Sequence, residues 1–328
     1  MRRHDSRSWT GFVVSVSGRR EPRIAVVGVG HFGRHHARVL SALPGVHLES
    51  VVDLDVERAK TIAAEVGTGF ESDVASLDGR VDAVTLAVPT AVHHAVALPL
   101  LTRGISVLVE KPIAQSVVEA DELIAAAAKS GAVLAVGHAE RYNPAVAAAL
   151  PLVQSPRFIE VHRIGAFPGR SLDIDVVFDL MIHDLDIILT AVGGGVASVE
   201  AVGVPVLTDR ADIANARLTF ENGCIANLTA SRISREQIRK LRFFQQDAYI
   251  SVDCAAREVE GWRVNRGSGP SPRIEGGKLD VPPGEPLALE LADFVAALDG
   301  GPPPMVDGGA GRRALALAER VAQAMGAT

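Results

Sequence analysis

Two kinds of apolar pattern alternate along the first 140 residues. Short apolar runs rich in β-branched residues predict buried strands at 24–27, 46–52, 81–88, 105–109 and 132–136. Apolar residues at helical spacing predict helices between them, over 37–43, 56–66, 95–103 and 117–129. This alternation predicts an α/β fold with a doubly wound parallel sheet of the Rossmann type over about residues 22–138.

The pattern changes in the second half of the chain. A strand is expected over 158–165 and a long apolar helix over 176–192. Segments with partial apolar–polar alternation then predict strands over 198–206, 213–220, 224–233, 240–245 and 249–253. Asn222-Gly223 separates two of them and is a typical hairpin turn. We therefore expect a large, open, mostly antiparallel sheet in an α+β domain, with one face packed on the helix and the other available to a second subunit.

Residues 265–286 are rich in Gly and Pro and predict a long loop, after which helices are expected over 287–298 and 312–325. We divide the chain into an extension (1–20), a dinucleotide-binding domain (21–140) and a domain for substrate binding and oligomerisation (141–328). We expect the extension to be disordered. An alternative is twin-arginine export, because Arg2-Arg3 precedes a short, weakly apolar run.

Gly28, Gly30 and Gly33 form the motif G-x-G-x-x-G between the first strand and the first helix. The first glycine permits a tight turn, the second lets the backbone approach a pyrophosphate, and the third lets helix and strand pack closely. Asp53 ends the second strand about 20 positions later, where a carboxylate can bind ribose hydroxyls and repel a 2′-phosphate. The motif therefore predicts NAD rather than NADP, although Asp53 is also consistent with a surface turn.

The composition excludes several classes of protein. Hydrophobic residues make up 48% and charged residues 22% of the 328 positions, as in soluble globular proteins. A net charge of -6 without a cluster of Lys and Arg argues against a nucleic-acid surface. No apolar stretch is long enough to span a membrane. Cys224 and Cys254 are too few for a disulfide framework or a zinc site, so we expect reduced thiols in the cytoplasm.

Lys111 is the most informative residue at a strand end. Gly28, Pro89 and Lys111 each follow a predicted strand, and ligands of open α/β sheets bind outside the carboxyl ends of the strands. The Lys111 ammonium can polarise a hydroxyl or carbonyl oxygen and stabilise alkoxide charge. A lysine that only reaches solvent from a strand end is the alternative.

Polar residues form one stripe on the apolar helix 176–192. Asp175, Asp179, His183 and Asp186 recur at i, i+4, i+8 and i+11, and Asp184 lies off the stripe. His183 is suited to take a hydroxyl proton, and Asp179 could orient its imidazole. A core histidine bonded to a carboxylate is one alternative, and a divalent metal on Asp179, His183 and Asp186 is another. Hydride transfer needs no metal and no Cys joins these residues, so we expect none.

These motifs together resemble the Gfo/Idh/MocA oxidoreductases from about residue 21 onward. The resemblance depends on the order and spacing of segments 28–33, 89–93 and 110–112, with Asp179 and His183. It implies a Rossmann domain, a second domain with an open sheet, and homodimers or homotetramers formed through that sheet. It also implies Lys111 and His183 as catalytic residues with Asp179 beside them. Val88 replaces the Thr that is common in the family, a change that we expect to be tolerated.

The glycine motif, the strand ends and the resemblance also yield a set of expected NAD contacts. They are Gly28, Gly30, His31, Phe32, Gly33, Asp53, Pro89, Thr90, His93, Glu110 and Lys111.

Three segments, 137–144, 178–189 and 215–232, resemble family members that oxidise the C3 hydroxyl of UDP-N-acetylglucosamine. In that pathway an aminotransferase converts the ketone to an amine, for the diamino sugars of lipid A or other cell-surface glycans. The resemblance therefore implies NAD-dependent oxidation of a nucleotide sugar. The alternatives are another sugar or a polyol such as inositol, and a non-catalytic NAD-binding sensor or scaffold.

A nucleotide-sugar diphosphate requires cations. Arg141, Arg163 and Arg170 lie in segments that lead into the second domain, so they are the expected partners, although Arg170 is equally consistent with a surface arginine. Tyr142 and Asn143 complete the expected substrate contacts, with Asn143 placed to bond sugar hydroxyls.

Overall fold

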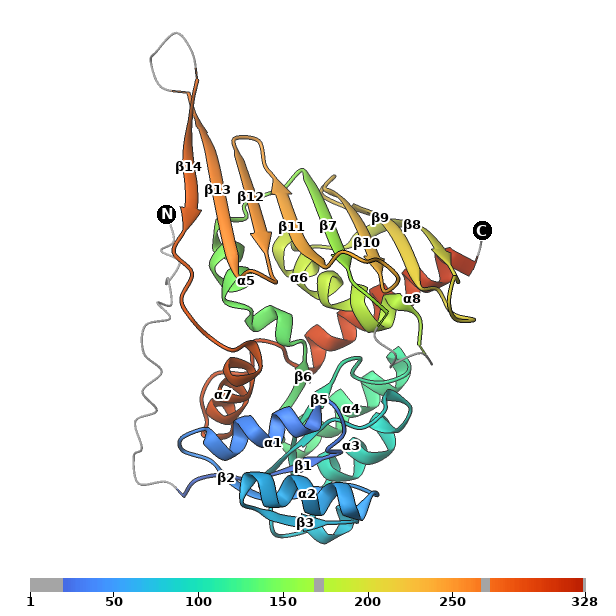
Figure 1. Ribbon diagram of the computed structural model, residues 1–328, viewed down its shortest axis with the longest axis vertical. Coiled ribbons are helices and arrows are strands. Elements are labelled where there is room, and N and C mark those ends of the chain that lie inside the picture. Colours follow the sequence, from blue (N-terminus) through green and yellow to red (C-terminus); the bar gives the residue numbers. More distant parts are fainter. Residues whose placement is uncertain (1–19, 168–173, 267–271, 327–328) are drawn as a thin grey trace.

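The computed structural model describes residues 20–167, 174–266 and 272–326, so that of the predicted extension only its last residue, Arg20, is described. The chain forms an α/β part and a second part built on a large open sheet (Figure 1). The second part lies against the α/β part at one end of its strands, and helices fill the space between the two sheets.

The first sheet has six parallel strands in the order β3-β2-β1-β4-β5-β6, which confirms the predicted doubly wound sheet. Its strands are β1 (Arg23–Val27), β2 (His47–Val52), β3 (Gly69–Glu71), β4 (Ala83–Leu86), β5 (Ser106–Glu110) and β6 (Leu134–Gly137). The helices that connect them are α1 (Gly33–Ala42), α2 (Val56–Val66), α3 (His93–Thr102) and α4 (Val117–Ser130). Strand β3 was not predicted because it has three residues, none of them buried.

Helix α4 begins as the sequence predicts. The Ser116 hydroxyl accepts a hydrogen bond from the backbone N–H of Glu119 at 3.3 Å. The Glu119 carboxylate accepts one in return from the N–H of Gln115 at 2.9 Å, one residue before the usual partner in a capping box. Gly131, at φ 76°, ends the helix.

The glycine motif is required by backbone geometry at two positions. Gly28 has φ 81°, in the left-handed region. A Cβ atom on Gly33 would lie 1.7 Å from the carbonyl oxygen of Gly28, so only glycine allows α1 to begin this close to β1. Gly30 differs because a Cβ there would meet nothing closer than Arg58 Nη1 at 3.7 Å.

The second sheet has eight strands in the order β14-β13-β12-β11-β7-β10-β9-β8, and β7 and β10 are its only parallel neighbours among the described residues. The strands are β7 (Phe158–Ile164), β8 (Val196–Val204), β9 (Ile213–Phe220), β10 (Ile225–Ser231), β11 (Ile238–Phe244), β12 (Ala248–Asp253), β13 (Glu258–Asn265) and β14 (Arg273–Leu279). This confirms the mostly antiparallel sheet and the hairpin at Asn222-Gly223.

The loop predicted over 265–286 is wrong, because β14 lies within it and pairs with β13. Glycines weaken the alternation by which a strand is recognised in a sequence. Here a Cβ on Gly276 would lie 2.0 Å from the carbonyl oxygen of Gly261. Gly276 therefore permits β13 and β14 to pair closely, in a segment whose Gly- and Pro-rich composition suggested a loop.

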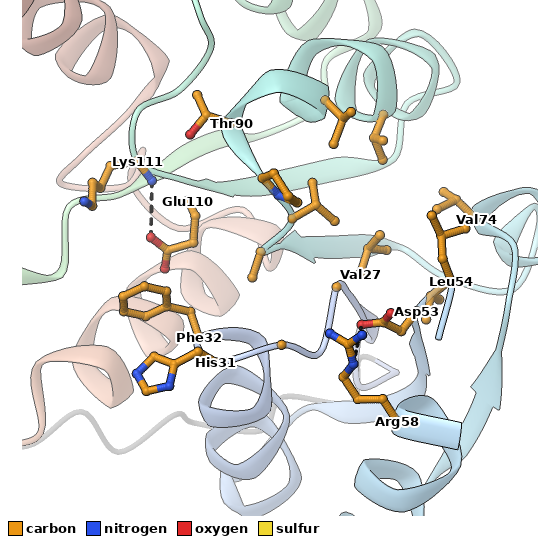
Figure 2. A pocket seen from close by; sticks show the side chains of 18 of the residues that line it. Val27, His31, Phe32, Asp53, Leu54, Arg58, Val74, Thr90, Glu110 and Lys111 are labelled. Carbon is orange, nitrogen blue, oxygen red and sulfur yellow. Dashed lines mark hydrogen bonds and ion pairs between the residues drawn. The ribbon is translucent and has the colours of Figure 1, made fainter. Parts of the chain in front are cut away.

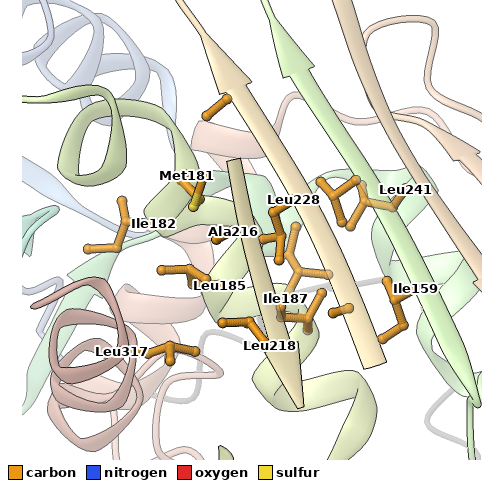
Figure 3. Packing of buried hydrophobic residues seen from close by; sticks show 14 of the residues in the cluster. Ile159, Met181, Ile182, Leu185, Ile187, Ala216, Leu218, Leu228, Leu241 and Leu317 are labelled. Atoms are coloured by element: carbon orange, nitrogen blue, oxygen red, sulfur yellow. The ribbon is translucent and has the colours of Figure 1, made fainter. Parts of the chain in front are cut away.

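One face of the second sheet packs on helices. These are α5 (Pro144–Ala149), α6 (Ile182–Val192) and α8 (Gly308–Gly326). Leu185 and Ile187 of α6 and Leu317 of α8 contact a core that includes Leu218 and Leu228 of the strands (Figure 3). Burial alternates along β9, which is why its sequence predicts a strand with one covered face.

The C-terminal segment returns to the first sheet. Helix α7 (Pro286–Leu298) lies beside α1, and its Leu291 and Phe294 join the core formed by Ile24 and Leu108 (Figure 1). Ala135 of β6 also forms a β-bridge with Asp307. The packing unit around the first sheet therefore includes residues from well beyond position 140.

We expect Gly33→Ala to lower the free energy of unfolding by about 3 kcal/mol or more, because its methyl group would overlap the Gly28 carbonyl. Gly30→Ala should change it by only about 0.5 kcal/mol, since the added methyl group meets no atom closer than van der Waals distance. Urea unfolding of both variants tests this pair. Equal stability of the two variants would contradict the steric argument.

Candidate active site

Two adjoining cavities open at the carboxyl ends of the parallel strands. They have volumes of about 700 and 720 Å³. The first follows the glycine turn and the ends of β2, β4 and β5. The second lies between the ends of β5 and β6 and the second sheet. Phe32, Glu110, Lys111 and Asp179 line both cavities, so a ligand in one would meet a ligand in the other beside these four residues.

Asp53 lies at one end of the first cavity and Lys111 at the other (Figure 2). The Asp53 carboxylate accepts hydrogen bonds from the N–H groups of Val29 and Asp55, each at 2.9 Å. These bonds hold it at the carboxyl end of β2, where it faces the cavity. An elongated cavity with the glycine turn between an acidic end and a lysine end fits a dinucleotide bound across the sheet.

Arg58 is a neighbour of Asp53 that the sequence did not indicate. Its guanidinium lies 3.9 Å from the Asp53 carboxylate and donates to Asp55 at 2.8 Å. The side chain lines the cavity beside Gly30. The acidic end of the cavity therefore holds an arginine next to the carboxylate that was predicted to bind ribose.

Most of the predicted NAD contacts line the first cavity. They are Gly28, Gly30, His31, Phe32, Asp53, Pro89, Thr90, Glu110 and Lys111. Gly33 packs beneath the turn instead. His93 is buried, and its ring nitrogens lie 2.8 Å from the carbonyl oxygen of Pro112 and 2.9 Å from that of Val88. It joins the loops that carry Pro89 and Lys111, and burial lowers the pKa of its imidazole.

Lys111 is held in the site rather than in solvent. Its side chain is 10% exposed. Its ammonium donates to the carbonyl oxygen of Asp179 at 2.5 Å and lies 3.4 Å from the Asp179 carboxylate. A lysine that only reaches solvent from a strand end would not be covered in this way. That alternative for Lys111 is therefore excluded.

Glu110, the last residue of β5, holds the backbone of Lys111 in place. Its carboxylate lies 2.9 Å from Nε2 of the buried His36 and accepts from the Lys111 N–H at 3.2 Å. Burial alone would raise the pKa of Glu110, but the His36 hydrogen bond and the nearby charges lower it, so the carboxylate stays charged. A Cβ on Gly137 would lie 2.9 Å from this side chain, which explains the glycine at the end of β6.

His183 lies in the second cavity, at the start of α6. Its ring packs edge-to-face on His138, with 5.8 Å between the ring centres. Its pKa lies well below the usual value because of burial and the positive charges of Lys111, Arg163 and Arg239. The imidazole is therefore neutral near pH 7, as a proton acceptor must be.

The predicted support of His183 by Asp179 is not formed. Among the described residues no hydrogen bond joins them, and His183 Nδ1 is buried without a partner. The predicted helix is interrupted by a π-helical turn, η5 (Val177–Met181), which changes the angle between positions four apart. Asp179 faces Lys111 instead, and Asp175 accepts from the Val177 N–H at 2.8 Å.

The predicted substrate residues are distributed over several environments. Arg163 lines the second cavity but forms two 2.8 Å hydrogen bonds to Asp184. Arg141 is buried 3.5 Å from Asp186, whose pKa burial raises to about 6. Arg141, Tyr142 and Asn143 line neither cavity.

Tyr142 and Asn143 hold the backbone in place. The Tyr142 hydroxyl donates to Asp293 of α7 at 2.7 Å. Asn143 accepts from the Ala145 N–H to cap α5 and donates to the Cys254 carbonyl at 2.9 Å. Arg170 lies outside the described residues.

The second cavity has cationic residues that the sequence analysis did not select. Arg232 and Arg235 lie in the segment between β10 and β11, Arg239 lies at the start of β11, and all three line the wall of this cavity. They recur three and four residues apart in the run SRISREQIR, which is the signal by which they could have been found. The predicted cations all lie in segments that lead into the second domain, so these three were not among them.

Two features are absent from the described part of the chain. No helix in it is long and apolar enough to cross a membrane. No group of three or more His, Cys, Asp or Glu side chains in it is arranged to hold a metal ion.

Comparison with known proteins identifies the family. The GFO/IDH/MocA model of oxidoreductases with an NAD-binding Rossmann fold matches residues 22–138, and a C-terminal domain model matches 170–251. The chain is 42% identical over 303 residues to UDP-N-acetylglucosamine 3-dehydrogenase of Acidithiobacillus ferrooxidans, covering 91% of this chain and 96% of the relative. The chain belongs to the Gfo/Idh/MocA family.

This family membership confirms the predicted oxidoreductase class and the NAD cofactor. A solved structure of the Acidithiobacillus enzyme superposes with a TM-score of 0.87 over 93% of this chain and 98% of that one. Levoglucosan dehydrogenase has a TM-score of 0.83 at 17% identity, covering 93% and 97% of the two chains, and so shows the fold alone. A scyllo-inositol 2-dehydrogenase of Bacillus subtilis is 28% identical over 231 residues, covering 65% of this chain and 68% of the relative.

We expect Asp53→Ala to lower kcat/KM for NAD about tenfold or more, because a charged acceptor for ribose hydroxyls is lost. Activity with NADP should rise in relative terms, since Arg58 would no longer face the Asp53 carboxylate and could meet a 2′-phosphate. The measurement is the ratio of the two kcat/KM values. In Asp53→Ala/Arg58→Ala the gain for NADP should disappear, and an unchanged ratio in the single variant would contradict the ribose role.

Acidification should reduce activity only well below pH 6.5, the ordinary imidazole pKa, because neutral His183 is the form that accepts a proton. Its lowered pKa keeps it neutral until the pH falls through that lower value. A profile of kcat/KM for the sugar substrate from pH 5 to 8 measures this. NADH binding over the same range is the control, and loss of activity centred at or above pH 6.5 would contradict the assignment.

Proposed function

We propose that this protein oxidises the C3 hydroxyl of UDP-N-acetylglucosamine to a ketone and reduces NAD+ to NADH. The observation that carries the proposal is the 42% identity, over 91% of the chain, to an enzyme of that name. The site agrees with it chemically, since Lys111 stands where the two cavities meet and the neutral His183 lines the second cavity. The inositol dehydrogenases are more distant and cover less of the chain.

NAD+ bound in the first cavity supplies the hydride acceptor. Gly30, where a Cβ would meet no atom closer than 3.7 Å, would leave room for its pyrophosphate, and Asp53 would accept hydrogen bonds from its ribose hydroxyls. His183 takes the proton of the substrate hydroxyl. The Lys111 ammonium, held by the Asp179 carbonyl, stabilises the negative charge that develops on the same oxygen. One hydride and one proton leave the substrate, so the products are the ketone, NADH and one proton.

We infer that residues 21–140 bind NAD and that the region 141–328 binds substrate and forms a homodimer or homotetramer through its sheet. An aminotransferase would consume the ketone. The cytoplasm is the compartment we propose, and the two described thiols, Cys224 and Cys254, are free and buried as a reducing compartment allows.

The test of the substrate is turnover with a panel. The purified protein and NAD+ are incubated with UDP-N-acetylglucosamine, UDP-glucose, N-acetylglucosamine and myo-inositol, and NADH is followed by absorbance. We expect the highest kcat/KM with UDP-N-acetylglucosamine. Turnover of inositol without turnover of the nucleotide sugar would overturn the proposal in favour of the polyol alternative.

The test of the catalytic residues uses Lys111→Ala and His183→Ala. We expect each variant to reduce kcat at least about 100-fold, because each removes charge stabilisation or a proton acceptor. NADH affinity should stay within a few-fold, measured by calorimetry, because Asp53 and the glycine turn are untouched. Variants that keep wild-type turnover would favour a non-catalytic NAD-binding protein or a different catalytic pair.

A further inference from the structure

The arginines around the second cavity differ in how completely their charge is neutralised. Arg163 and Arg232 are both buried, and each is bonded at 2.8 Å to a carboxylate. Their partners are Asp184 and Asp212. A buried carboxylate held in this way neutralises the charge of its guanidinium and fixes the position of the side chain. The inner arginines therefore shape the cavity wall, and an anionic ligand needs other cations.

Arg235 and Arg239 are those cations. Arg235 is exposed, lines the second cavity and takes part in no hydrogen bond or ion pair with the described residues. The side chain of Arg239 is 40% exposed and lies 3.5 Å from Glu140. The same Glu140 oxygen is 3.5 Å from Arg163, so one carboxylate serves two guanidiniums.

Strand pairing strengthens the argument for an anion here. Arg239 of β11 lies directly opposite Arg163 of β7 in the sheet register. Like charges in this relation repel each other unless an anion lies between them. Glu140 supplies one negative charge and Asp184 a second, while Arg163, Arg239 and Arg235 supply three positive charges. The wall of the cavity formed by the second sheet therefore has an excess of positive charge.

These arginines line the same cavity as His183 and Lys111. They belong to the second sheet and the segment before β11, whereas Lys111 follows β5 of the first sheet. A sugar with its reacting carbon at the lysine and histidine would extend its remaining substituents into this cavity. We propose that Arg235 and Arg239 form a subsite for the diphosphate of a nucleotide-sugar substrate. The inference rests on the proposed function, and it replaces Arg141 and Arg163 as the residues that bind the diphosphate.

The test uses Arg235→Ala, Arg239→Ala and a matched control, Arg103→Ala. Arg103 is an exposed arginine at the end of α3 and lines neither cavity. We expect KM for UDP-N-acetylglucosamine to rise roughly tenfold or more in each of the first two variants. The value of kcat should stay within about threefold, because binding lost equally from substrate and transition state changes KM alone. Arg103→Ala should match the wild type.

Direct binding provides a second measurement that does not depend on turnover. UDP is titrated into the protein with NADH present, and its Kd should rise by the same factor in Arg235→Ala and Arg239→Ala. Lysine at either position should restore part of the affinity, because a point charge replaces a bidentate contact. NADH affinity should not change. Unchanged UDP affinity in both alanine variants, or an equal loss of NADH affinity, would overturn the subsite.

The two proposals fail in distinguishable ways. If the wild type binds UDP through these arginines but does not oxidise UDP-N-acetylglucosamine, the subsite holds and the proposed substrate is wrong. If the wild type oxidises UDP-N-acetylglucosamine and both alanine variants keep its KM, the function holds and the subsite is wrong.

Discussion

The contact between Lys111 and Asp179 is the constraint on which the rest of the site depends. It joins the end of β5 in the first sheet to the π-helical turn that packs under the second. Both residues line both cavities, so this contact fixes where a cofactor and a substrate would meet. Because Lys111 is covered and donates to a backbone carbonyl, its position does not depend on a flexible surface side chain. Glu110 and His93 hold the same loop through hydrogen bonds to its backbone at Lys111 and Pro112.

Around this contact the protein buries several charges in pairs. Arg163 with Asp184 and Arg232 with Asp212 are almost fully covered by protein. Such pairs contribute little net stability, because desolvation offsets their attraction. Removing one partner leaves an unpaired buried charge, so the pairs maintain a fixed cavity wall. Arg235 and Arg239, which are more exposed than these pairs, remain available to a ligand.

Local sequence patterns predicted the first domain well. Its strands, the capped helix α4 and the glycine turn depend on neighbouring residues, which a sequence displays directly. The prediction of the second sheet was less complete. It did not include β13, and it assigned β14 to a loop because Gly276 and Gly277 resemble a loop until pairing with β13 explains them. In the site, Lys111 and His183 were found from strand-end and helix patterns. Their partners were not, since the π-turn and the ion pairs of Arg163 arise only from tertiary packing.

The return of α7 to the first sheet has a consequence for how the chain acquires its structure. Leu291, Phe294 and Val295 complete a core whose other members lie before position 136. During synthesis the N-terminal half leaves the ribosome first, with the apolar surface beside α1 uncovered. That surface stays exposed until residues 291–295 have left the ribosome. The order of translation therefore delays completion of the cofactor domain until almost the whole chain is present.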